Sequence, residues 1–216
     1  MTGGCPPDAD HVWAYLQEPA EFFGVAMPGR LELTAALSDF AETVGSALVA
    51  TTVTIVEVAG APRIAVAGTA VQPLRAEAVR IAPDESVPHP HRASDPWWRR
   101  MAARTTSRGE LDQRERWLNG LGFADALSDG EPILGALVFE TPGGVVAVEN
   151  PEPTSVLDQL ARCGAMTPTT MVSTLPADAE RVWWVSPRYE THPVAELAGT
   201  PLAVANEAVP SFARWS

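Results

Sequence analysis

The chain has 216 residues, of which 46% are hydrophobic and 19% charged, so it can form one or two compact domains and is not a disordered chain. Its formal net charge of −12 disfavours nucleic acids and anionic membranes as partners, because both bind basic surfaces. No apolar run approaches the roughly 20 residues that span a bilayer, and the N-terminus lacks the pattern of a signal peptide. Two cysteines, Cys5 and Cys163, predict no disulfide framework. We therefore expect a protein of the reducing cytoplasm.

The first part of the chain predicts one clear helix and three strands. Residues 1–29 are rich in proline and predict an irregular N-terminal arm, with a short helix near residues 11–16. Apolar positions recur at helical spacing from residue 31 to 47. Alternating, β-branched segments predict strands at residues 51–58, 63–70 and 76–82. The proline-rich loop that follows, at residues 83–96, indicates a boundary between a small domain at 30–90 and a larger one at 91–216.

The second part predicts more strands than helices. A helix at residues 107–118 ends at Asn119-Gly120, and a second, short one runs from Thr154, its expected N-cap, to residue 162. The predicted strands lie at residues 123–127, 132–140, 145–148, 167–173 and 181–185, before a final hairpin around Ala198-Gly199. Strands that are grouped together, with few helices, predict an α+β fold.

Three segments carry a resemblance to known enzymes. Residues 103–108 read Ala-Arg-Thr-Thr-Ser-Arg, and residues 122–130 read Gly-Phe-Ala-Asp-Ala-Leu-Ser-Asp-Gly. Residues 177–202 run from Ala-Asp-Ala-Glu-Arg-Val through Ser-Pro-Arg-Tyr to His-Pro-Val and Gly-Thr-Pro-Leu. In this order and spacing they resemble the class IV aminotransferases, the fold type IV enzymes of pyridoxal phosphate (PLP), and aminodeoxychorismate lyase in particular. The resemblance implies a fold type IV-like architecture, with a truncated small N-terminal domain and a C-terminal domain built on a bent antiparallel sheet.

The departures from the family concern the residues that hold PLP. The chain has fifteen arginines and no lysine, and Arg104 stands where the family has the lysine that forms the Schiff base. An arginine cannot replace it, because the guanidinium stays protonated. Leu134 is the best match to the glutamate that binds the pyridine nitrogen; Glu131 lies too early in the sequence.

The phosphate-binding segment is also changed. The family holds the cofactor phosphate at a helix start that reads Leu-Pro-Gly-Ile-Thr-Arg, and here the equivalent residues are Glu-Pro-Thr-Ser-Val-Leu at 152–157. Only Thr154 and Ser155 could still donate from side chains, and Glu149 and Glu152 are close in sequence. The N-terminal strands with the family's Gly-x-Phe-Glu-Thr segment are missing. The resemblance therefore leads us to expect no cofactor.

The candidate site residues follow from the resemblance. Arg104, Arg108 and Arg188 would converge on the former cofactor pocket, where guanidinium groups could hold a carboxylate or phosphate. The alternative is that Arg104 forms a salt bridge with a neighbouring glutamate. Further ligand-binding candidates are Ser186, Thr154 and Ser155, and the candidates for catalytic acid–base groups are His192, Tyr189 and Glu131.

Aromatic and histidine pairs have ordinary alternatives. Trp97-Trp98 could form a stacking wall for a planar ligand, or could pack in the core or in a dimer interface. Trp183-Trp184 lies in a predicted strand, so we expect one ring to face the core and the other to face solvent. His89 and His91 flank a proline in a loop without further ligands at metal-binding spacing, so we expect no metal site.

Three functions remain open from the sequence. The first is a PLP-independent, degenerate homologue, or pseudoenzyme, that binds a small anionic metabolite or a partner protein. The second is an enzyme whose pocket acts without PLP on a small acidic substrate, such as a chorismate-like compound or an amino or keto acid. The third is a genuine PLP-dependent aminotransferase or lyase. The resemblance implies a homodimer, or a heterodimer with a full-length relative.

Overall fold

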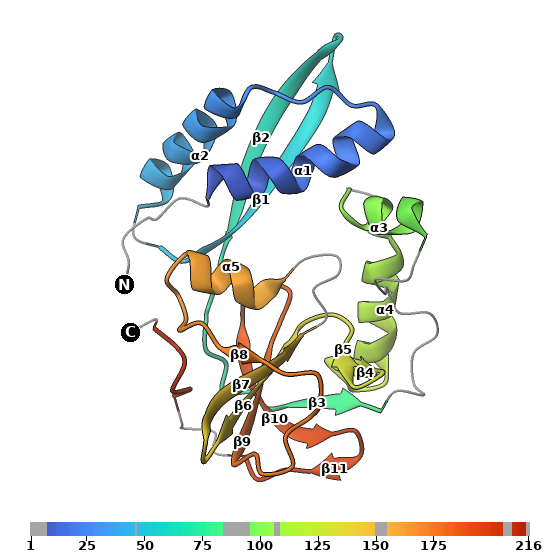
Figure 1. Ribbon diagram of the computed structural model, residues 1–216, viewed down its shortest axis with the longest axis vertical. Helices are drawn as coiled ribbons and strands as arrows, with labels where there is room; N and C mark the ends of the chain where they lie inside the picture. The colour runs from blue at the N-terminus through green and yellow to red at the C-terminus, as the bar shows by residue number, and fades with distance from the viewer. Residues whose placement is uncertain are drawn as a thin grey trace.

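The N-terminal part of the molecule is a pair of helices packed on a long hairpin. The computed structural model describes residues 8–45, 47–83, 96–105, 109–149, 155–204 and 209–214 (Figure 1). The N-terminal elements are α1 (Ala9–Phe23), α2 (Arg30–Val44), β1 (Val49–Val58) and β2 (Ala61–Ala70). The short helix predicted near residues 11–16 is present, but it is longer than expected: α1 has 15 residues, so the irregular arm predicted around it is wrong for them. The carboxylate of Asp8 caps it, accepting from the backbone N–H groups of Asp10 and His11.

The packing of α2 explains why the hairpin is held. Leu33, Leu37 and Ala41 recur every four residues, so they lie on one face of α2, and all three are buried. β1 and β2 pair antiparallel along their whole length. Phe40 lies so close to Gly68 of β2 that a Cβ atom there would collide with its ring. Among the described residues, β1 is preceded by the two helices α1 and α2.

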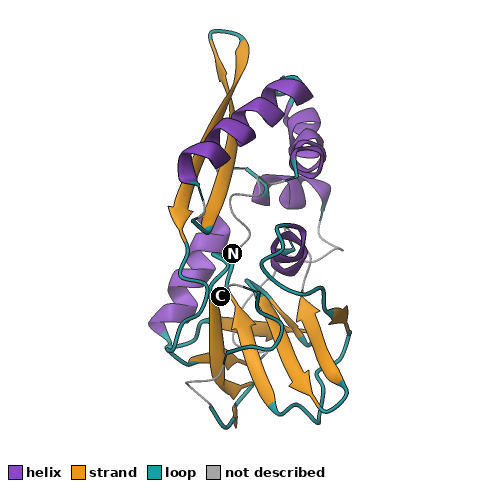
Figure 2. Cartoon of the chain, turned by 90° about the vertical axis from the view of Figure 1, so that its left-hand side faces the viewer, coloured by secondary structure: helices purple, strands orange, loops and turns teal. Residues whose placement is uncertain are grey.

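The C-terminal part is built on one curled, mixed sheet. Its strands are β3 (Val79–Ala82), β4 (Asp125–Ser128), β5 (Glu131–Pro132), β6 (Ala136–Thr141), β7 (Gly144–Glu149), β8 (Thr170–Met171), β9 (Arg181–Val185), β10 (Thr191–Leu197) and β11 (Thr200–Pro201). Within the described residues the order is β5-β4-β3-β10-β9-β6-β7-β8, with β11 paired to β10. The centre is antiparallel as expected, but β3 pairs parallel with both β4 and β10, and β7 pairs parallel with β8. The two sheets lie at opposite ends of the molecule (Figure 2).

Both faces of the larger sheet carry a core. Side chains alternate along a strand, so Trp183 and Trp184 point to opposite faces. Trp183 packs with Val138 and Leu157, and Trp184 packs with Leu137 and Val194 in a separate cluster. Both rings are buried, so the expectation that one would face solvent is wrong. The reason is that α5 (Val156–Arg162) and the segment before β9 cover the two faces.

Three further helices complete the fold, and two of them differ from their predictions. α3 (Trp97–Ala103) was not expected, whereas α4 (Gly109–Gly120) confirms the helix predicted near residues 107–118. The N-cap of α5 is Ser155 rather than Thr154, which lies outside the described residues. In the described part of the chain no helix is both long and apolar enough to cross a membrane.

Gly135 provides a test of this packing. It lies at the entry to β6, where a Cβ atom would stand 2.7 Å from Trp184 Nε1 and collide with the carbonyl oxygen of Val185. We expect Gly135→Ala to lower the free energy of unfolding by about 3 kcal/mol, measured by urea denaturation, because backbone must move. The control is Gly120→Ala, at a position with open space around it, which should change stability by less than about 1 kcal/mol. Equal effects of the two variants would contradict the close approach.

Candidate functional site

Arg104, which the sequence resemblance aligns with the family's lysine, is bound by another side chain of the same chain. It follows the last residue of α3, and its guanidinium Nη1 donates to Oε2 of Glu18 on α1. The guanidinium carbon also lies 4.8 Å from the ring centre of Tyr15. The Arg104 side chain is 14% exposed and that of Glu18 is 38% exposed. The structure therefore contains the salt bridge that the sequence left as an alternative, with a partner 86 residues away.

Glu149 holds the start of α5. Its Oε1 accepts from the backbone N–H groups of Val156 and Leu157, the second at 3.2 Å, and its Oε2 accepts from the Ser155 hydroxyl at 2.7 Å. The residue is 7% exposed. Burial raises the pKa of Glu149, while these hydrogen bonds act to lower it. A carboxylate thus lies at the helix start that resembles the family's phosphate-binding segment.

Asp125 organises the turn that the sequence resemblance aligns with the family's pyridine-binding segment. The side chain is completely buried, and its Oδ1 accepts from the backbone N–H groups of Ala126 at 2.7 Å and Ile133 at 3.2 Å. The N–H groups of Leu134 and Gly135 also donate to the carboxylate. Indole Nε1 of Trp184 donates to Oδ2 at 2.8 Å. The backbone of residues 133–135 is therefore turned inward, toward a carboxylate of the same chain.

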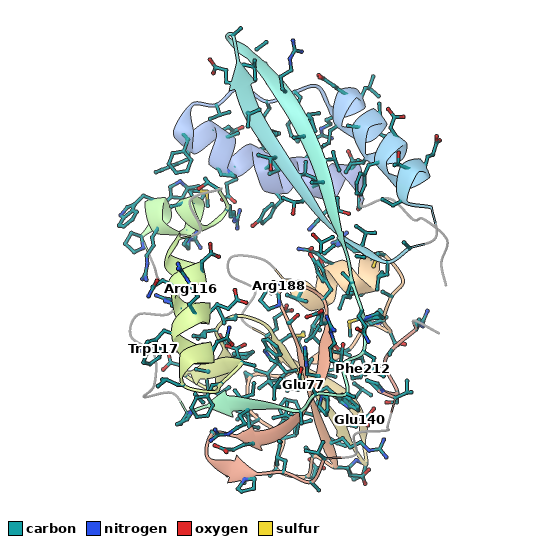
Figure 3. All side chains as sticks on the ribbon, turned by 180° about the vertical axis from the view of Figure 1, so that it is seen from behind. Glu77, Arg116, Trp117, Glu140, Arg188 and Phe212 are labelled. Atoms are coloured by element: carbon teal, nitrogen blue, oxygen red, sulfur yellow. The ribbon has the colours of Figure 1, made fainter. Side chains whose placement is uncertain are left out.

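The loop between β9 and β10 contains three of the candidate residues. The Ser186 hydroxyl accepts from the backbone N–H groups of Arg188 and Glu190, both at 3.1 Å, so it stabilises the loop. Tyr189 has a positive φ of 65°, and its hydroxyl donates to Gln159 on α5. The side chain of Arg188, labelled in Figure 3, is 73% exposed. Its Nη2 lies 3.1 Å from Oε1 of Glu115 on α4. Arg188 and Arg104 thus bind different glutamates on different helices.

The two other candidate catalytic residues lie on separate strands. His192 on β10 places Nδ1 3.1 Å from the carbonyl oxygen of Glu77 and Nε2 4.0 Å from the carboxylate of Glu190. Glu131 lies on β5, and β4 and β3 stand between that strand and β10. Arg108, His89, His91 and Thr154 lie outside the described residues. Among the residues that the structure describes, no group of three His, Cys, Asp or Glu side chains could hold a metal ion.

Two residues with central contacts, Asp125 and Glu18, were not assigned a role from the sequence. Asp125 stood inside a matched segment, but its buried role depends on Trp184, which is 59 residues away. Glu18 lies in the segment that was predicted to be mostly irregular.

The tryptophan pair of α3 is largely exposed. Trp97 and Trp98 are 44% and 60% exposed, and the Trp97 ring centre lies 6.4 Å from that of Phe22 on α1.

Comparison with solved structures identifies the architecture, although no protein-family model and no curated protein sequence matches the chain. A hypothetical aminotransferase from Mycobacterium tuberculosis, in its PLP-bound form, superimposes with a TM-score of 0.62 at 18% identity, over 93% of this chain and 79% of that chain. This chain has the fold of the fold type IV aminotransferases. A putative 4-amino-4-deoxychorismate lyase from Legionella pneumophila gives a TM-score of 0.59 at 12% identity, over 92% of this chain and 81% of the other. A branched-chain aminotransferase from Thermoproteus uzoniensis gives a TM-score of 0.56 at 16% identity, over 92% of this chain and 74% of the other.

The titration of Asp125 tests the account of the buried turn. Burial raises the pKa of Asp125 from 3.8 to about 6, against the opposing effect of its hydrogen bonds. The native state therefore binds the proton of the Asp125 carboxyl more tightly than the unfolded chain does. Protonation of Asp125 stabilises the native state fully below pH 3.8, and this stabilisation is lost as the pH rises through about 6. The free energy of unfolding of the wild type, minus that of Asp125→Asn, should fall by something on the order of 3 kcal/mol across this window. If the free energy of unfolding of the wild type minus that of Asp125→Asn rises with pH instead, the N–H donors lower the pKa of Asp125 by more than burial raises it.

Proposed function

We propose that this chain is a PLP-independent, degenerate homologue of the class IV aminotransferases and aminodeoxychorismate lyase, and that it binds a small anionic metabolite without Schiff-base chemistry. The observation that carries the proposal is the carboxylate of Glu149 at the start of α5, where it accepts from the N–H groups of Val156 and Leu157 and from the hydroxyl of Ser155. A phosphate would need these same donors, and would meet a negative charge there.

The other residues of the region do not fit PLP either. No lysine is present in the chain to form the Schiff base, and Arg104 at that position is bound to Glu18. Leu134, the match to the glutamate that would bind the pyridine nitrogen, offers an apolar side chain, and its backbone N–H donates to Asp125. Three separate parts of a PLP site are thus replaced together, which supports a function that does not use the cofactor.

Arg104 supports a carboxylate as the ligand. Its guanidinium already binds a carboxylate, that of Glu18, and an arginine can present two parallel N–H donors to such a group. The side chain is largely shielded from water, and Tyr15 lies against the guanidinium. Shielding strengthens the attraction between this cation and an anion. A small carboxylate is therefore the ligand class that this group favours, and malonate serves as the probe.

The cofactor part of the proposal is tested by adding PLP and removing the excess by desalting. We expect the wild type to retain no PLP absorbance, and Arg104→Lys to retain no band of a PLP–lysine Schiff base, because Glu149 still holds the donors that a phosphate needs. Arg116→Lys, on the exposed face of α4, controls for a Schiff base at any accessible lysine. A band that the wild type retains after desalting, or that Arg104→Lys retains beyond the Arg116→Lys control, would refute this part.

The anion part is tested by titration with malonate in a calorimeter. We expect Arg104→Gln to lower the affinity for malonate by about tenfold or more, because a charge-assisted hydrogen bond is lost. Arg116→Gln removes a guanidinium of the same charge from α4 and should bind malonate as the wild type does. Thermal unfolding of both variants checks that they fold. Equal malonate affinity in the wild type and Arg104→Gln would contradict a role for Arg104.

A further inference from the structure

Helix α1 lies across two other parts of the fold and contacts each through polar groups. At its start, Asp8 lies 3.4 Å from Arg162 and His11 lies 4.0 Å from Asp158, both on α5. In its middle, Glu18 binds Arg104 at the end of α3. Figure 1 shows α1 running from a position above α5 to one above α3. The helix therefore connects α5, whose start resembles the family's phosphate-binding segment, with α3, which Arg104 follows at the position aligned with the family's lysine.

The attachment of α1 differs from that of its neighbours. Its buried residues are Pro19 and Ala20, whereas α2 buries Leu33, Leu37 and Ala41. Pro19 also lies inside the helix, where a proline removes a backbone hydrogen bond. The contacts of Asp8 and His11 with α5 involve side chains that are between 37% and 48% exposed, and such pairs add little stability. α1 thus has fewer fully buried side chains than α2, and its ion pairs with α5 are exposed, which is typical of an element that opens locally.

We propose that α1 is a releasable strap, and that the carboxylate of Glu18 is an internal occupant of Arg104 which a small carboxylate ligand displaces. The inference rests on the proposed function, because it assigns the same guanidinium to the ligand. With α1 docked, Glu18 satisfies the cation and Arg104 is largely covered. A ligand that binds Arg104 only after Glu18 has left favours the released form of the helix. The release of α1 breaks no covalent bond and needs no further reactant.

The strap is tested without any ligand, by hydrogen–deuterium exchange of the backbone amides of α1. We expect Glu18→Gln to speed exchange in α1 about tenfold, because the hydrogen bond to a charged partner is weakened, and to leave α2 unchanged. Glu21→Gln is the matched control, since Glu21 lies on the same helix and its Oε1 accepts a hydrogen bond from Gln17, one turn earlier on α1. Equal exchange in Glu18→Gln and Glu21→Gln would overturn the strap.

Malonate binding then distinguishes a failure of the strap proposal from a failure of the proposed function. We expect Glu18→Gln to bind malonate about tenfold more tightly than the wild type or Glu21→Gln, and malonate to speed α1 exchange in the wild type. Malonate binding that depends on Arg104 but is the same in Glu18→Gln would overturn displacement and leave the proposed function standing. No malonate binding in any variant would refute the proposed anion site, while the exchange rates without malonate still decide whether α1 is a strap.

Discussion

The buried carboxylate of Asp125 is the interaction on which the C-terminal part of the fold depends. It joins β4, the turn at residues 133–135 and β9 through hydrogen bonds from four backbone N–H groups and one indole. An unpaired N–H group inside a protein costs free energy, so removing this acceptor would leave several groups unsatisfied at once. The turn is consequently shaped for packing, and Gly135 is needed where the backbone passes Trp184 and Val185.

The same arrangement recurs at the two positions where the family resemblance places PLP. Glu149 accepts from the first N–H groups of α5, and Glu18 accepts from Arg104. In each case a carboxylate of the chain satisfies donors that would otherwise attract an anion from solution. The fold is retained while its anion-binding groups have partners of their own. The two cases differ in their surroundings, because Glu149 is buried, whereas Glu18 lies on a helix with few buried side chains.

Local patterns predicted the elements whose periodicity is strong, and long-range contacts explain what was missed. The strand predicted at 51–58 and the helix predicted at 31–47 were found because β-branched or apolar residues repeat there at a clear period. α1 was underestimated because Pro19 breaks its pattern, and α3 is a single short Trp- and Arg-rich segment without a period. The position of Arg104 followed from the family resemblance. Its partner Glu18, like the pairing of Asp125 with Trp184, depends on tertiary structure that no local pattern records.

The central claim is that a carboxylate of the chain, that of Glu149, takes the place of the cofactor phosphate. The most direct measurement is phosphorus NMR of PLP titrated with the wild-type protein, because the resonance reports on the phosphate itself. We predict that its chemical shift and line width stay those of free PLP. A shifted, broadened resonance that returns to the free position when inorganic phosphate is added in excess, in the wild type and in Arg104→Gln alike, would contradict the account, since it would show a phosphate site that does not depend on Arg104.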